Sequence, residues 1–121
     1  MFKLIKIDAA YVNALTELVV ACRAYGTKIN EVNSYNNGWL VTFEGVRGDA
    51  ICHDGSYGSP CYMGSYDPTV YHNDWSESGR WETIGMPWDG EDVSVHSAEW
   101  LALMIARLQA GATYNESWEE E

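Results

Sequence analysis

Residues 28–56 read KINEVNSYNNGWLVTFEGVRGDAICHDGS, and this stretch decides the fold class. Asn37-Gly38 is a strong hairpin signal, because both residues accept the left-handed backbone of a tight turn. A weaker strand, Ile29–Tyr35, precedes the turn, and a strongly alternating strand follows it at residues 39–44. The side chains expected on one side of this second strand are Trp39, Val41 and Phe43.

The chain continues in the same way after the hairpin. A turn at residues 45–48 leads into a strand at Ala50–His53, and a further strand is expected at Arg80–Ile84. Short strands joined by tight turns are typical of an antiparallel meander, whereas parallel strands need long crossovers. Residues 2–7 are expected to form a short edge strand or a lead-in to the first helix.

Helical periodicity flanks the strands on both sides. We expect a first helix at about residues 9–25, with Asp8 as its N-cap and Gly26 ending it. Its expected core side chains are Val12, Leu15 and Val19. A last helix is expected between Ser97, as N-cap, and Gly111. Its expected core side chains are Leu101, Met104, Ile105 and Leu108.

These elements predict an α+β fold over one domain, residues 1–121. We expect an antiparallel sheet of three to five strands, a meander, with the N-terminal and C-terminal helices packed on one face. The acidic tail, residues 112–121, is expected to fray. Residues 54–79 show no regular period, and a loop of this length in a compact domain is usually functional or disordered.

The net charge of −11 is unevenly distributed along the 121 residues. Residues 1–50 carry equal numbers of acids and bases, so the whole excess lies in residues 51–121, with two basic residues against thirteen acids. This sign argues against direct contact with nucleic acid or with an acidic membrane, and favours a basic protein surface. The alternative is that the acidity only keeps the protein in solution.

The sequence shows no stretch long enough to span a membrane. Three cysteines, Cys22, Cys52 and Cys61, are an odd number, which fits reduced thiols better than a disulfide framework. We therefore expect a cytoplasmic protein.

A zinc site is the first chemical hypothesis, because Cys52, His53, Cys61 and His72 lie close in sequence. Zinc ligands usually come in pairs with short spacings, such as two cysteines separated by two residues. Cys52 and His53 are instead adjacent, and adjacent side chains of a strand point to opposite faces. The spacing therefore disfavours zinc, and no cofactor is expected.

A catalytic triad is the second hypothesis, since His53, Asp54 and Ser56 supply the residue types. Triads are assembled from distant positions so that each side chain can hydrogen-bond the next one. Consecutive residues seldom achieve this, so we expect no enzymatic activity. A phosphate-binding loop is also disfavoured, because no lysine or arginine lies between Arg47 and Arg80.

Four stretches follow one another in a recognisable order. They are the strand Gly-Trp-Leu-Val-Thr-Phe at residues 38–43, Cys52 to Gly58 with the pattern His-x-Gly-Ser-Tyr-Gly, Gly79-Arg80-Trp81-Glu82, and the helix after Ser97. This order resembles a recurrent group of small, uncharacterised bacteriophage proteins. The resemblance covers roughly residues 38–108, while the acidic tail and residues 59–78 look peculiar to this chain. It implies a phage origin and no established activity. Small acidic phage proteins are often inhibitors of host machinery, including anti-restriction and anti-CRISPR proteins.

A protein-binding surface is therefore the leading hypothesis. Tyrosine and tryptophan give large contact areas with few rotatable bonds to freeze, and carboxylates can meet lysines and arginines that otherwise bind phosphates. The expected contact residues are Tyr57, Tyr62, Tyr66, Asp67, Tyr71, Asp74, Trp75, Glu77, Asp89, Glu91 and Asp92. The expected partner is a host protein with a basic, nucleic-acid-binding surface, such as a restriction or CRISPR effector.

Two other classes of function stay open. One is a protein that sequesters a small molecule, such as a nucleotide signal, in a pocket under the 54–79 loop. The other is a small hydrolase that uses His53 with Asp54 or Cys61.

Overall fold

The computed structural model describes residues 9–56, 81–92 and 94–120. In chain order the elements are α1 (Ala9–Tyr25), β1 (Ile29–Tyr35), β2 (Gly38–Phe43), β3 (Asp49–Cys52), β4 (Trp81–Ile84), β5 (Ser94–His96), α2 (Ala98–Gln109) and the 3-10 helix η2 (Glu116–Glu120). Asp8, residues 2–7 and nearly all of the expected loop at 54–79 lie outside the described residues.

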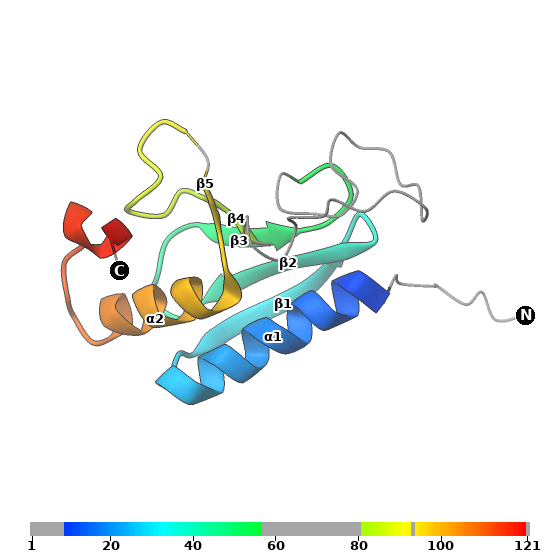
Figure 1. Ribbon diagram of the computed structural model, residues 1–121, viewed down its shortest axis with the longest axis horizontal. Coiled ribbons are helices and arrows are strands. Elements are labelled where there is room, and N and C mark those ends of the chain that lie inside the picture. Colours follow the sequence, from blue (N-terminus) through cyan, green and yellow to red (C-terminus); the bar gives the residue numbers. More distant parts are fainter. Residues whose placement is uncertain (1–8, 57–80, 93, 121) are drawn as a thin grey trace, which may run out of the picture.

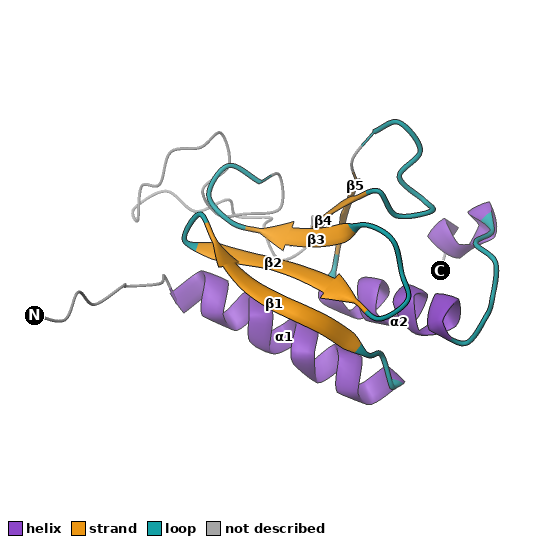
Figure 2. Ribbon diagram, turned by 180° about the vertical axis from the view of Figure 1, so that it is seen from behind, coloured by secondary structure: helices purple, strands orange, loops and turns teal. Residues whose placement is uncertain are grey.

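The protein is α+β, as the sequence predicts. Its sheet has five strands in the order β1-β2-β3-β4-β5, and every neighbouring pair is antiparallel. Both long helices cover the same face of the sheet, and α1 runs along β1 (Figures 1 and 2). The strand β5 is an addition to the sequence prediction, which placed no element between Ile84 and Ser97.

The hairpin turn lies one residue earlier than the sequence predicts. Tyr35 pairs with Gly38, so the two loop residues are Asn36 and Asn37, with φ angles of 46° and 64°. The reason is that Gly38 is needed inside the strand. A Cβ atom at Gly38 would lie 2.0 Å from the carbonyl oxygen of Cys52.

The predicted boundaries of α1 are correct, but the predicted core face is wrong. The buried side chains are Tyr11, Ala14, Leu18 and Cys22, whereas Val12 is 45% exposed. Leu15 and Val19 are half-buried. The helix carries apolar residues on most of its circumference, so two neighbouring stripes have the same helical period and the pattern cannot choose between them.

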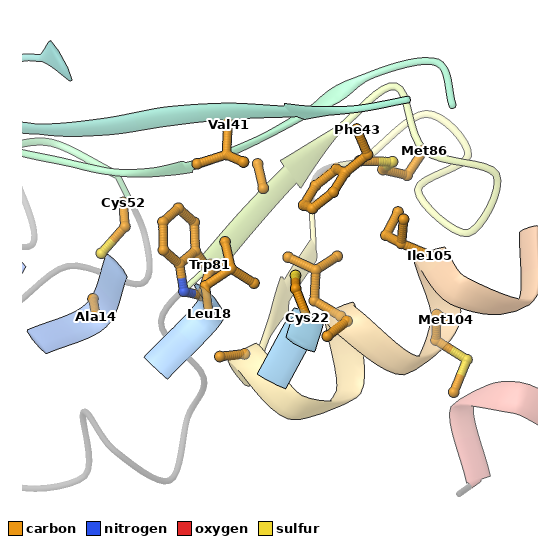
Figure 3. Close-up of a cluster of buried hydrophobic side chains, with 14 of the residues drawn as sticks. Ala14, Leu18, Cys22, Val41, Phe43, Cys52, Trp81, Met86, Met104 and Ile105 are labelled. Carbon is orange, nitrogen blue, oxygen red and sulfur yellow. The ribbon is translucent and has the colours of Figure 1, made fainter. Parts of the chain in front are cut away.

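Trp81 is the largest fully buried side chain and lies at the middle of the core. Figure 3 shows its indole between the sheet and Leu18 of α1, with Ala14 and Cys52 close by. From α2 the core receives Leu101, Met104 and Ile105, as predicted, while Leu108 is only partly buried. A buried tryptophan contributes on the order of 3–5 kcal/mol relative to alanine at such a position.

The ends of α2 are fixed by the predicted residues. Ser97 accepts a hydrogen bond from the backbone N–H of Trp100, and Gly111 takes a φ of 96° just past the last turn. The expectation of a frayed tail does not hold for residues 116–120, which form η2 and bury Trp118. The physical reason is that a single large aromatic side chain fixes an otherwise acidic segment.

Thiol reactivity tests this core. Cys22 and Cys52 are 2% and 0% exposed, and burial raises the pKa of the Cys22 thiol to about 11 against the opposing hydrogen bond with Thr27. Because the thiolate is the reactive form, a Cys61→Ser variant should not react with Ellman's reagent until it is unfolded. Both thiols should then react in guanidinium chloride. Rapid reaction of either thiol in the native protein would show that this side of the core is open.

Candidate protein-binding site

Residues 53–56, which include the residue types of a catalytic triad, form a turn that is held by hydrogen bonds. The Ser56 hydroxyl donates to the backbone oxygen of His53 at 2.8 Å and accepts from the His53 N–H at 3.0 Å. The Asp54 carboxylate accepts from the Tyr11 hydroxyl at 2.6 Å and from the Asn37 side-chain amide at 2.7 Å. Asp54 thus joins α1 to the hairpin turn.

The imidazole of His53 faces the backbone. Its Nδ1 lies 2.8 Å from the carbonyl oxygen of Asp54, and its ring meets Tyr35 edge-on at 5.0 Å between centroids. The contact with Tyr35 passes over Gly38, which lies between the two residues in the sheet register. The Asp54 carboxylate is therefore bonded to Tyr11 and Asn37 and does not orient the imidazole, as it would in a triad.

Asp89 is the centre of a second polar cluster. Its carboxylate accepts from the hydroxyls of Thr83 at 2.8 Å and Ser94 at 2.5 Å, and from the backbone N–H of Met86 at 3.0 Å. The indole N–H of Trp88 donates to Thr83 at 2.9 Å. Asp89 is only 8% exposed. It fixes the turn between β4 and β5.

Asp89, Ser94 and His96 supply the three residue types of a catalytic triad. Their order in space differs from that of a working triad. The Ser94 hydroxyl lies between Asp89 and His96, whose Nε2 is 2.8 Å away. In a working triad the histidine stands between the acid and the serine. Because the Ser94 proton is directed at Asp89, the imidazole donates to the serine oxygen and does not deprotonate it.

Five aromatic rings gather beside this cluster at the end of the molecule that carries the C-terminus. We call them the C-terminal aromatic cluster: Trp88, His96, Trp100, Tyr114 and Trp118. His96 stacks on Trp100 with centroids 3.9 Å apart and planes 12° apart. Trp88 meets Trp100 at 5.1 Å and Tyr114 at 6.2 Å, both edge-on. The cluster joins the β4–β5 turn to α2 and η2.

Exposed carboxylates lie in the two segments that contribute Trp88 and Trp118 to the C-terminal aromatic cluster, the β4–β5 turn and η2. We define the acidic end as the exposed side chains Glu91, Asp92, Glu116, Glu119 and Glu120. The Trp88–Tyr114 contact joins the β4–β5 turn to the segment that leads into η2. Partial burial and a hydrogen bond to Glu119 raise the pKa of the Tyr114 hydroxyl.

One basic residue, Arg107, lies within the described part of residues 81–120. Its guanidinium carbon is 5.2 Å from the centroid of the Trp118 ring, and Nη1 is 3.7 Å from the sulfur of Met104. The positive charge is thus placed over an aromatic face, where it stabilises the position of η2. Residues 81–92 and 94–120 thus place one arginine against the five exposed carboxylates of the acidic end, which is an excess of negative charge.

The predicted contact residues divide into three groups. Tyr57, Tyr62, Tyr66, Asp67, Tyr71, Asp74, Trp75 and Glu77 lie outside the described residues. Glu91 and Asp92 are exposed, in agreement with a surface role. Asp89 is buried with both oxygens bonded inside the protein, so we remove it from the contact set.

Sequence reasoning missed most of the acidic end. Glu116, Glu119 and Glu120 were placed in a frayed tail, and the ring contacts of His96, Trp100 and Tyr114 come from three separate segments. One signal was present in the sequence. Trp118 stands alone among carboxylates, and a tryptophan in such a tail indicates that the tail packs onto the domain.

His96 gives the cluster a pH dependence. Burial lowers the pKa of His96, although the carboxylates of Asp89 and Glu119 act in the opposite direction. The unfolded chain therefore takes up this proton more readily than the folded protein. The stability that neutral His96 contributes is complete above about pH 6.5 and is lost as the pH falls through that value toward the lower folded pKa.

The free energy of unfolding between pH 7 and pH 5 tests this effect. We expect His96→Gln to show a shallower loss of stability over this range than the unsubstituted protein, measured by urea unfolding at each pH. The same carboxylates titrate in both proteins, so the difference between the two curves isolates His96. Parallel curves would mean that His96 has equal proton affinity in the folded and unfolded states.

Metal binding and membrane insertion receive no support from the described residues. Within residues 9–56, 81–92 and 94–120 no three His, Cys, Asp or Glu side chains form a group that could hold a metal ion. No helix in this part of the chain is long and apolar enough to cross a membrane. Comparisons of the chain with protein-family models, curated proteins and solved structures find no match.

Proposed function

We propose that the protein binds a basic, nucleic-acid-binding surface of another protein and blocks it. The observation that carries the proposal is the acidic end, where the two segments joined by the Trp88–Tyr114 contact both carry exposed carboxylates. Carboxylates replace the phosphates that such a basic surface normally meets, and the partly exposed rings of Trp100 and Tyr114 supply apolar contact.

The arrangement suits binding better than catalysis. The hydroxyl and imidazole groups described above are engaged in fixing turns, and the carboxylates of the acidic end are exposed on a turn and a short helix. Tyr114 and Trp118 hold η2 by ring contacts, so its carboxylates are partly pre-positioned before binding. The resemblance to small phage proteins supports a restriction or CRISPR effector in the host cytoplasm as the target.

Capture followed by competition tests this function. The immobilised protein is mixed with a nuclease-treated lysate of the host cell, and the retained proteins are eluted with a salt gradient and identified. We expect a nucleic-acid-binding protein that elutes early in the gradient, because exposed charge pairs are screened by salt. The captured protein is then purified, loaded with its own DNA or RNA, and titrated with this protein.

We expect release of the nucleic acid at a stoichiometric ratio near one. A captured protein that keeps its nucleic acid when bound would overturn the blocking mechanism. A retained set without any nucleic-acid-binding protein would overturn the choice of partner.

A further inference from the structure

Within residues 9–56, 81–92 and 94–120, the strand β1 forms one edge of the sheet. Among the described strands it pairs only with β2, and its residues from Asn30 to Tyr35 are all exposed. An open edge presents unpaired N–H and C=O groups to any extended chain. The charges that usually protect such an edge are scarce, since Glu31 is the only charged residue of the strand.

The register shows which backbone groups point outward. In a hairpin with a two-residue loop, Tyr35 and Gly38 form a hydrogen-bonded pair, and the bonding alternates along the strand. Asn33 and Glu31 therefore bond β2 as well. Val32 and Ser34 direct their N–H and C=O groups at the open edge.

The apolar stripe of α1 that the sequence placed in the core lies below this edge. Ala21, Ala24 and Val20 line a groove with α2, which fixes one flank of α1. Since successive residues turn by about 100°, Val12, Leu15 and Val19 lie on the opposite flank. Figures 1 and 2 show α1 running along β1, so this flank faces outward beside β1. Val32, which is 40% exposed, is in register with buried Val41 and therefore points to the same helix side.

We propose that this surface, the β1 edge with the flank Val12, Leu15 and Val19, pairs with the same surface of a second copy of the chain. In an antiparallel pairing about a two-fold axis, Val32 meets Val32 of the second copy, and both exchange their outward N–H···O=C bonds. Glu31 then faces Asn33 of the second copy, and an amide donor meets a carboxylate acceptor. Within one chain this pair already bonds at 3.3 Å.

For a second copy of the chain, the charge distribution favours this surface over the acidic end. Two chains of net charge −11 repel each other, and the cost is smallest where the facing surfaces carry the fewest acids. The acidic end lies at the other side of the molecule, away from β1 (Figure 1). A strand edge alone buries too little area for a stable dimer, which needs about 800 Å² per partner, so the helix flanks must also meet.

The mass of the full chain in solution tests the pairing. Sedimentation or light scattering over a concentration series should give a dimer of two 13.6 kDa chains. Val32→Pro removes an outward N–H that β2 does not use, and edge strands tolerate proline there. We expect it to shift dissociation to at least tenfold higher concentration, while Val32→Thr, which keeps the N–H, leaves the dimer intact.

A matched pair on α1 tests the helix contact. Val12→Glu places a charge on the proposed flank, and Val20→Glu places the same charge on the flank that faces α2. We expect Val12→Glu to yield monomers and Val20→Glu to stay dimeric, with circular dichroism confirming that both variants fold. Equal effects of the two substitutions would overturn the proposed surface, and so would a chain that is monomeric at every concentration.

The proposed register between the two β1 strands can be tested by disulfide cross-linking in a Cys61→Ser background. Val32→Cys should form an intermolecular disulfide under mild oxidation, because the two thiols meet at the axis. Ser34→Cys should not, since its copies lie four residues apart along the paired strands, about 13 Å. Cross-linking through Ser34→Cys and not through Val32→Cys would overturn this register. The dimer does not depend on the proposed function, so either can fail without the other.

Discussion

Replacing Gly38 with alanine is expected to destabilise the protein by about 3 kcal/mol or more, because the added methyl group has no room. The new Cβ would lie 2.0 Å from the carbonyl oxygen of Cys52 and 2.6 Å from Cα of His53. Both are backbone atoms, at the last residue of β3 and at the residue that follows it, so no side-chain rotation relieves the overlap. The β2–β3 pairing must open, and with it the contact of Tyr35 with His53 over the glycine.

Thermal unfolding measures this effect, with a fall in Tm of about 10 °C or more expected for Gly38→Ala. Gly45→Ala is the matched control. Gly45 has a φ of 70°, and a Cβ there meets nothing within 4 Å, so only the left-handed backbone penalty of about 1 kcal/mol applies. Equal losses in the two variants would mean that the β2–β3 spacing can relax.

Replacing Asp89 with alanine is expected to cost about 3 kcal/mol, and replacing Asp92 with alanine less than about 0.5 kcal/mol. The two residues are three positions apart in one acidic turn, and sequence reasoning gave them the same role. The structure separates them. Asp89 accepts from Thr83, Ser94 and the Met86 N–H, which all lose a partner in the variant.

Urea unfolding of Asp89→Ala and Asp92→Ala measures the difference. Asp89→Asn is an informative third variant, because it keeps the volume but removes the charge from the acceptor. We expect its stability between the other two. If Asp92→Ala proved the more destabilising substitution, the assignment of Asp89 as the residue that fixes the turn would be wrong.

The sequence predicts the architecture well because period and turn chemistry are local. Alternation at residues 39–44 and the helical stripes on both sides specify a meander between two helices. The helical period alone cannot determine which face of a helix packs against the sheet. Val12, Leu15 and Val19 repeat as regularly as Tyr11, Leu18 and Cys22, and only packing against the sheet chooses the second set.

At the hairpin and at the candidate site, too, tertiary contacts decide details that the sequence pattern leaves open. Asn36-Asn37 and Asn37-Gly38 are both acceptable turns, and the close approach of Cys52 to Gly38 decides between them. At the acidic end, β5 has only three residues, and Trp118 is joined to Trp100 by a hydrogen bond across 18 residues. Such contacts leave no periodic pattern in the sequence.

In residues 53–56, likewise, the residue types alone did not predict the role of the side chains. His53, Asp54 and Ser56 have the chemistry of an active site, yet each is bound to a structural partner at the start of the segment that follows β3. The residue types correctly indicate side chains that form hydrogen bonds. Only the geometry shows that these bonds hold the structure together and do not assemble an active site. The acidic end, by contrast, keeps its carboxylates at the surface.

Charge reversal tests the acidic end as the contact surface most directly. Glu91→Lys with Glu116→Lys reverses two charges at the acidic end, and Glu17→Lys with Glu44→Lys reverses two exposed charges elsewhere. Both double variants have the same net charge. The dissociation constant for the captured nucleic-acid-binding protein is measured for each at low salt. We expect at least a tenfold loss of affinity for the first variant and a much smaller change for the second. Equal losses, or a loss confined to the second variant, would mean that the acidic end is not the contact surface.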